Sequence, residues 1–386
     1  MGTIVAVRAT PISIPLEGAY EWSCGYVAGF SRTIVEVEDS DGVTGLGESP
    51  SPADADAIND VLGPNLIGAN PYDLADCERR CLPLIRELRT ITDLSSLHAY
   101  TGIEIALWDI IGKLEGRPLY SLLGGQARPA ARFTEYFCFR DGFEQTPLEV
   151  ARYCAQMIEL HGARCLEGKV GARDLETDIA MVREIRAAVG DAIPIRLDAN
   201  MAWTTAQARL ALRRFEEFNI LSIEEPVATL EEMARIRATT TIGFSAHEAN
   251  LTAAVRLGAP DAFVVQFGMF GGIRRTLSFM AACEEFGVNV WFKSPDAGVA
   301  TAAQLHVTAA VDSVSEPSQS LLRWHADEVI AEGPFVPKDG EVPPPDAPGL
   351  GVTLDPVALA RCAERYANEG SLDFRPRGAI TAVAPE

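Results

Sequence analysis

The feature that most constrains the fold is a regular alternation of short apolar segments with amphipathic helical segments, which starts near residue 130. Such alternation predicts successive βαβ units and a parallel sheet. Eight strands are predicted, at residues 132–139, 165–170, 194–200, 221–226, 242–247, 262–267, 288–294 and 318–322. Eight strands at this spacing favour a (β/α)8-type barrel over a doubly wound sheet, and the chemistry of such barrels gathers at the C-terminal strand ends.

The part of the chain before the barrel has a different pattern and predicts an α+β unit. Residues 3–15 and 31–38 read as strands, and an Asp-Gly turn at 41–42 leads into a return strand. Residues 17–31 are rich in glycine and aromatic side chains, and we expect a loop there, either a lid or a packed connection. Residues 51–125 then read as helices.

The end of the chain is rich in proline and glycine and then contains one helical segment, DPVALARCAERYANE. We expect this tail to pack back on the N-terminal unit. The predicted organisation is therefore an α+β unit at 1–125, a barrel at 126–330 and a returning C-terminal segment at 331–386.

Composition excludes several classes of function. The 386 residues include 54 Asp and Glu against 33 Lys and Arg, a formal net charge of −21, which argues against a nucleic-acid partner. The N-terminus lacks the basic and apolar regions of a signal peptide, and no apolar run approaches the length of a membrane span. The eight cysteines contain no CxxC pair, so we expect reduced core cysteines in a cytoplasmic protein.

Charged and polar residues recur at the ends of the predicted barrel strands. They are Glu167 and Lys169, Asp198 and Asn200, Glu224, His247 and Glu248, Gln266, and Lys293. Because side chains alternate along a strand, Glu167 and Lys169 share one face, as do Asp198 and Asn200. Charged groups that converge in a barrel mouth are costly unless they bind something.

Two of these residues, Asp198 and Glu224, read as ligands of a divalent metal. Carboxylates on successive strands suit Mg²⁺, which prefers oxygen ligands and keeps waters or substrate oxygens in its shell. The alternative is that each acid caps the helix after its strand. A lone Asp favours that alternative, whereas the concerted pattern favours the metal site.

Lysine is scarce, which makes each lysine informative. Only four of the 33 basic residues are lysine, and two of them, Lys169 and Lys293, fall at strand ends. A partly desolvated lysine beside a metal has a lowered pKa and can act as a base. Lys113 and Lys338 lie outside the predicted barrel strands, and we expect them on the surface.

Five motifs together resemble the enolase superfamily, in its mandelate racemase and muconate lactonizing branch, over nearly the whole chain. They are GLGE at 45–48, TGIEIALWDIIGKLEGRPLYSLLGG at 101–125, LDAN at 197–200, IEEP at 223–226 and FGGI at 270–273. The resemblance implies a modified (β/α)7β (TIM-like) barrel with an α+β N-terminal capping domain. It also implies Mg²⁺ bound to a substrate carboxylate, a base that removes the α-proton, and a stabilised enediolate.

Loops of the capping domain are implied to close over the barrel mouth, which makes Trp22, Tyr26 and Phe30 candidates for substrate contact. The chain departs from the family pattern at two strands: Glu167 replaces the first lysine of a Lys-x-Lys pair, and strand 6 carries Gln266. A carboxylate at Glu167 raises the pKa of Lys169 unless it bonds elsewhere or meets the substrate.

The third metal ligand stays open at this level. Family position favours His247, whereas ligand chemistry favours Glu248, because neutral imidazole suits softer metals than Mg²⁺.

Within the branch, the sequence most resembles glucarate dehydratase-like proteins, which implies dehydration of an acid sugar or a similar hydroxy acid. Lys169 is then the base, Lys293 protonates the departing hydroxyl or serves the opposite face, and Asn200 and Gln266 bind substrate oxygens. The alternatives are a racemase, epimerase or cycloisomerase of a carboxylic acid, and a non-catalytic relative. By analogy we expect a symmetric homo-oligomer with a small-molecule carboxylate substrate.

Overall fold

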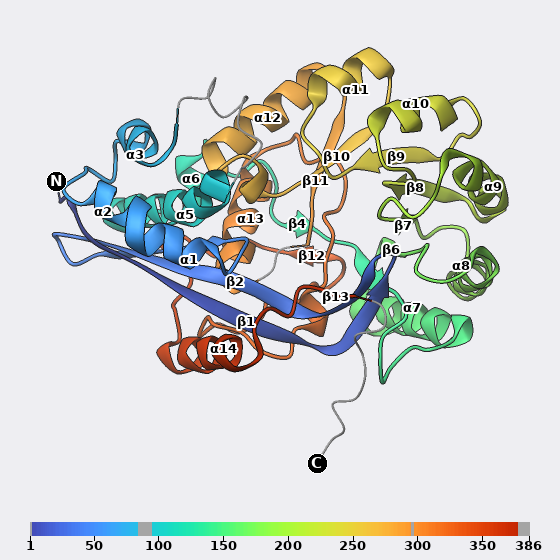
Figure 1. Ribbon diagram of the computed structural model, residues 1–386, viewed down its shortest axis with the longest axis horizontal. Coiled ribbons are helices and arrows are strands. Elements are labelled where there is room, and N and C mark those ends of the chain that lie inside the picture. Colours follow the sequence, from blue (N-terminus) through green and yellow to red (C-terminus); the bar gives the residue numbers. More distant parts are fainter. Residues whose placement is uncertain (1, 84–94, 295–296, 377–386) are drawn as a thin grey trace.

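The computed structural model describes residues 2–83, 95–294 and 297–376, and its centre is a curled parallel sheet surrounded by helices (Figure 1). Seven strands follow one another around this sheet in sequence order. They are β5 (Glu135–Phe137), β6 (Leu166–Lys169), β7 (Ile195–Asp198), β8 (Ile220–Glu224), β9 (Gly243–Ala246), β10 (Ala262–Val265) and β11 (Asn289–Phe292).

A helix follows each of these strands, as the alternating sequence pattern predicts. They are α7 (Pro147–His161), α8 (Leu175–Val189), α9 (Thr205–Phe215), α10 (Leu230–Arg237), α11 (Leu251–Leu257), α12 (Ile273–Glu285) and α13 (Gly298–Ala310). Short polar side chains fix several starting points: Thr146 and Thr204 form capping boxes, and Asp174 and Thr229 accept one backbone N–H each.

The barrel is closed by an irregular segment and not by the predicted strand at 318–322. Parallel bridges pair Ser318 with Phe133 and Val314 with Val290. The backbone N–H of Gln319 donates to the carbonyl of Phe292 at 2.9 Å. A short helical turn then spans Leu322–Trp324. The segment therefore completes the ring with isolated bridges, and the modified (β/α)7β barrel is confirmed.

The N-terminal sheet contains β1 (Ile4–Trp22), β2 (Gly25–Asp39) and β3 (Thr44–Ser49). The predicted loop at 17–31 is wrong. Both strands continue through it and turn at residues 23–24, with Trp22 paired to Gly25. The aromatic side chains that suggested a lid are also good strand formers, so the hairpin extends to its tip.

The helices of this unit are α1 (Asp54–Ala57), a π-helical turn (Ile58–Leu62), α2 (Gly63–Leu66), α3 (Leu74–Cys81), α5 (Ser95–Glu115) and α6 (Leu119–Leu122). The long helix α5 packs on β2 and β3. The contact needs glycine, since a Cβ on Gly47 of β3 would lie 1.8 Å from the carbonyl oxygen of Gly102 on α5.

Two minor strands, β4 (Ala131–Arg132) and β12 (Glu341–Val342), pair with each other. The C-terminal segment returns to the N-terminal sheet: α14 (Pro356–Glu369) packs on β1, and β13 (Arg375–Pro376) pairs with β2 at the hairpin tip.

A buried acid of the N-terminal unit caps a barrel helix and so helps to fix the unit over the barrel. Glu104 of α5 accepts the backbone N–H groups of Ile273 at 2.7 Å and Arg274 at 3.1 Å, at the start of α12. Negative charge at a helix N-terminus is favourable. Gly272, directly before Ile273, has a φ of 122°. A Cβ on this residue would lie 2.5 Å from a carboxylate oxygen of Glu104. The motifs at 101–125 and 270–273 are therefore two sides of one contact.

Lys113 differs from the surface lysine that the sequence predicts. Its ammonium donates to Asp109 at 2.6 Å and to the Thr44 carbonyl at 2.8 Å. Asp109 is fully buried and also accepts the backbone N–H groups of Leu46 and Leu350. A buried carboxylate needs such a partner, and this requirement ties the ammonium of Lys113, whose side chain is 27% exposed, to the edge of the core.

The cysteines are unpaired, and seven of the eight are buried, with Cys24 exposed at the hairpin turn. Among the described residues, no helix has the length and apolar character that crossing a membrane requires.

Candidate active site

A cavity of about 200 Å³ lies at the C-terminal ends of the barrel strands, where the N-terminal hairpin meets the barrel. The structure brings six of the sequence-predicted polar residues together in its wall: Lys169, Asp198, Asn200, Glu224, His247 and Lys293. They come from the ends of β6, β7, β8, β9 and β11, because the C-terminal ends of parallel strands meet at one edge of a sheet.

Asp198 lies at the centre of the polar network in this pocket. One carboxylate oxygen accepts from the Lys169 ammonium at 2.5 Å and from the Tyr136 hydroxyl at 3.4 Å. The other accepts the backbone N–H of Asn200 at 3.0 Å. Lys169 also donates to the Asn200 side-chain oxygen at 2.6 Å. Asn200 has a left-handed backbone, with φ of 42°, which asparagine tolerates better than most residues.

Lys169 is held as an ammonium in this network, which differs from the lowered pKa that the sequence suggests. Burial by itself lowers the pKa of Lys169, but the charge of Asp198, followed by Tyr20 and Glu224, outweighs it and raises the pKa. Glu167 does not hydrogen-bond to this lysine, because it pairs with Arg196 beneath the pocket.

Asp198 and Glu224 form a donor set that fits a hard divalent cation. They are paired in register on β7 and β8 and are only 2% and 4% exposed. Burial and the charges of Asp198 and Glu167 raise the pKa of Glu224 far above its usual range. Burial thus disfavours a second negative charge beside Asp198, and a divalent cation would balance both carboxylates with the oxygen ligands that Mg²⁺ prefers.

Ligands other than Asp198 and Glu224 would complete the shell of the proposed metal. In the described part of the chain, no three His, Cys, Asp or Glu side chains form a ready metal cluster. Mg²⁺ commonly keeps waters and substrate oxygens, so two carboxylates are a sufficient protein contribution.

His247 and Glu248, the two candidates for a third ligand, lie in different places. His247 lines the pocket, whereas Glu248 is absent from the described residues that line it. The backbone N–H of His247 donates to Glu225 at 3.2 Å. Glu225 has a φ of 42°, and burial together with Asp198 raises its pKa to about 7. Position favours His247, and its role as a ligand stays a prediction.

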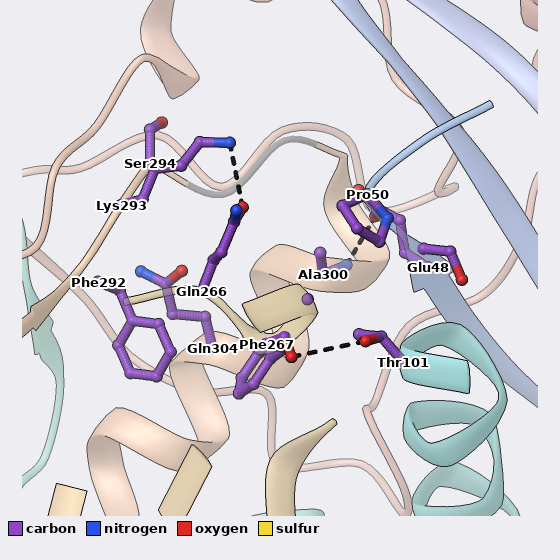
Figure 2. Close-up of a pocket in the computed structure, with 12 residues that line it drawn as sticks. Glu48, Pro50, Thr101, Gln266, Phe267, Phe292, Lys293, Ser294, Ala300 and Gln304 are labelled. Carbon is purple, nitrogen blue, oxygen red and sulfur yellow. Dashed lines mark hydrogen bonds between the residues drawn. The ribbon is translucent and has the colours of Figure 1, made fainter. Parts of the chain in front are cut away.

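Lys293 lies at the junction of this pocket and a smaller cavity of about 40 Å³ (Figure 2). Figure 2 shows its ammonium directed toward the side-chain oxygen of Gln266, at 3.4 Å. Gln266 lines the smaller cavity, together with Gln304 and Thr101. It therefore contacts Lys293 beside the larger pocket, and its predicted contact with substrate stays a prediction.

Strand alternation decides which hairpin residues reach the pocket. Tyr20 pairs with Val27, and these two side chains line the pocket with Trp22. Phe30 lines it as well, because the pairing of β1 with β2 shifts register between Pro15 and Tyr20 and so interrupts the alternation between Val27 and Phe30. Tyr26 pairs with Glu21 on the other face of the hairpin and is not among the described lining residues, so its contact with substrate stays a prediction.

Several pocket residues were missed by sequence reasoning: Tyr20, Tyr136, Arg32, Ser294, Gln319, Leu321 and Asp373. Alternation from the strand ends could have found Tyr20 and Tyr136. No local signal points to Asp373, which reaches the pocket because β13 pairs with β2, and which accepts from Arg32 at 2.6 Å.

Side-chain contacts help to fix the hairpin tip to the barrel. The Ser23 hydroxyl donates to the Asn200 carbonyl at 2.9 Å. The Arg173 guanidinium makes a bidentate pair with Glu21, at 2.7 and 3.0 Å. These bonds hold the hairpin, which carries the lining residues Tyr20 and Trp22, against the barrel.

Comparisons with known proteins agree with this architecture. Residues 4–124 match the family model described as mandelate racemase / muconate lactonizing enzyme, N-terminal domain, and residues 149–358 match the one described as enolase C-terminal domain-like. A protein of Streptomyces coelicolor named probable glucarate dehydratase is 29% identical, over 99% of this chain and 96% of that protein.

Two further relatives have different names. Muconate cycloisomerase 1-1 of Acinetobacter lwoffii is 26% identical, over 93% of this chain and 96% of that enzyme. The crystal structure of an enolase from Thermobispora bispora, complexed with magnesium and formate, has a TM-score of 0.87 and 27% identity, over 96% of this chain and 94% of that one.

Proposed function

Because this chain belongs to the mandelate racemase and muconate lactonizing enzyme family of the enolase superfamily, we propose that it is a Mg²⁺-dependent dehydratase of a small hydroxy acid. The observation that carries the proposal is one pocket lined by two lysines from different strands and by two buried carboxylates in register. Its volume of about 200 Å³ suits a small molecule.

The buried carboxylates Asp198 and Glu224 hold the metal in this proposal. Mg²⁺ bound there supplies positive charge that stabilises the substrate carboxylate and lowers the pKa of Lys169. The magnesium in the Thermobispora bispora enolase supports the choice of ion.

Lys169 removes the proton from the carbon next to the substrate carboxylate and leaves an enediolate. Lys293 gives a proton to the β-hydroxyl as its carbon–oxygen bond breaks, so that water departs. The enol product then becomes a 2-keto-3-deoxy acid. Asn200 holds the Lys169 ammonium at 2.6 Å through its side-chain oxygen, and Gln266 contacts Lys293, so both amides direct the lysines.

The glucarate dehydratase-like relative supports dehydration of an acid sugar. The test is a screen against a library of acid sugars with Mg²⁺, in which formation of 2-keto-3-deoxy acid is measured. A purified, folded protein that binds Mg²⁺ but forms no keto acid from any library member would refute the dehydratase assignment.

An isomerase is the second candidate, because two lysines at one pocket suit proton transfer between the two faces of a carbon atom. The muconate cycloisomerase relative supports this class. Incubation in D₂O separates the candidates: an epimerase returns the stereoisomer with deuterium at the α-carbon, whereas a dehydratase yields the keto acid. Absence of Mg²⁺ binding at millimolar concentration would instead favour a non-catalytic protein.

A further inference from the structure

Glu167, the residue that replaces a family lysine, lies in the barrel interior below the pocket. It is paired in register with Arg196, and Lys169 above it is paired with Asp198. Glu167 and Arg196 are both 1% exposed, and Arg196 donates to one Glu167 oxygen at 2.7 Å. The Thr134 hydroxyl donates to the same oxygen at 3.1 Å. Glu167 thus bonds within the barrel and does not line the substrate pocket.

The other oxygen of Glu167 accepts from the side-chain nitrogen of Gln319, at 3.0 Å. The same nitrogen donates to a carboxylate oxygen of Glu224 at 2.5 Å. Gln319 belongs to the segment that closes the barrel, and its backbone N–H is bonded to Phe292. One amide group, 95% buried, therefore bridges the buried pair and the proposed metal ligand.

The charge at position 167 determines which end of this amide faces Glu224. An amide nitrogen carries two N–H donors, and here each is used by a carboxylate. When Glu224 is ionised, as a metal ligand would be, a turned-over amide would direct its oxygen at two carboxylate oxygens, which is repulsive. A lysine at position 167 needs an acceptor, so it would draw the amide oxygen and turn the nitrogen away.

We propose that Glu167 and Gln319 are positioning residues that hold the Glu224 carboxylate for the metal, with Glu167 setting the direction of the Gln319 amide. This inference rests on the proposed function, since it takes Glu224 as a ligand. Partners that hydrogen-bond to metal ligands fix the orientation of those ligands, and their loss typically weakens metal binding by about 10- to 100-fold.

The test is calorimetric titration of Mg²⁺ into the full-length protein and its variants. Gln319→Leu removes both donors, and we expect it to weaken Mg²⁺ binding by about 10- to 100-fold. Gln319→Asn keeps an amide but shortens its reach by one carbon, so it should weaken Mg²⁺ binding as well. It takes the place of the leucine variant in the test if that variant does not fold. Glu167→Gln removes the charge that sets the amide direction and should also weaken binding.

Thr134→Val is the matched control, because it removes a donor to the Glu167 oxygen that Gln319 does not use. It should leave Mg²⁺ affinity within about twofold of the wild-type value. The lost hydrogen bond should still lower the midpoint of thermal unfolding without metal. Two results would each overturn this inference and leave the proposed function intact. One is that folded Gln319 variants bind Mg²⁺ as the wild type does, and the other is that Glu167→Gln and Thr134→Val lose Mg²⁺ affinity equally. A wild-type protein that binds no Mg²⁺ refutes the proposed function itself.

Discussion

Replacing Lys169 with methionine should have opposite effects on the metal-free and metal-bound protein. The methionine keeps the length and apolar part of the lysine side chain and removes only the ammonium that donates to Asp198 at 2.5 Å. Asp198 is 2% exposed, so its charge loses a close partner in a nearly dry site. The proposed base is lost as well, so turnover should fall below detection.

The expected loss of stability follows from what Asp198 retains. Breaking a buried ion pair by removing one partner costs about 3–5 kcal/mol. Asp198 keeps the Asn200 N–H at 3.0 Å and the Tyr136 hydroxyl at 3.4 Å, which places the loss near the lower end. We therefore expect Lys169→Met to lower the free energy of unfolding without Mg²⁺ by about 3 kcal/mol.

Mg²⁺ should bind the variant more tightly than the wild type, because the ammonium no longer competes for Asp198. An increase of about tenfold corresponds to about 1.4 kcal/mol of binding free energy. Urea unfolding with EDTA and with Mg²⁺ measures both effects. Lys338→Met, which removes the same charge from an exposed site, is the control and should change neither quantity. Unaltered stability without metal, or weaker Mg²⁺ binding, would show that Lys169 does not neutralise Asp198.

Three further predictions concern the metal shell, the interface between the two units and the hairpin. His247→Ala should weaken Mg²⁺ binding, measured by titration calorimetry, by about tenfold or more, whereas Glu248→Gln should leave it unchanged. A loss of Mg²⁺ affinity in Glu248→Gln but not in His247→Ala would assign the third ligand to Glu248. Burial outweighs the hydrogen bonds from Ile273, Arg274 and Trp108 and raises the pKa of Glu104 to about 7, so folding favours its protonated form. Its contribution to stability is present below about pH 4.5 and is lost as the pH rises to about 7, so Glu104→Gln should flatten the pH dependence of urea unfolding in this range, and an unchanged slope contradicts the assignment. Arg173→Met removes the bidentate pair with Glu21 and should raise KM by about tenfold with little change in stability. The control is Arg214→Met, which removes an exposed ion pair, and equal KM values for the two variants would show that the hairpin contact does not shape the pocket.

The barrel part of the fold could be predicted because its signals are local. Apolar runs alternate with amphipathic helices, and capping side chains such as Thr146 and Thr204 mark helix starts within a few residues. The positions of Lys169, Asp198 and Glu224 follow from the same signals, since each ends a strand and adjacent parallel strands end together.

Predictions failed where one local pattern fits two structures. Glycine and aromatic residues at 17–31 suit a loop, but they also suit a long hairpin, and pairing between β1 and β2 decided for the hairpin. The last barrel strand failed for a related reason. Residues near Ser318 close the ring through single bridges and side-chain bonds, a pattern without a sequence period.

The amino-acid sequence alone was sufficient to predict the barrel and the polar strand ends, because hydrophobic periodicity and helix capping act over a few residues. It could not assign partners across the barrel. Glu167 bonds to Arg196 and Gln319, which is 152 residues away in sequence, and Asp373 reaches Arg32 from the C-terminal segment. The charge of Asp198, with Tyr20 and Glu224, likewise reversed the expected pKa shift of Lys169. Charge interactions depend on distance and burial in space, so only the tertiary structure could decide which groups share the pocket and which state they hold.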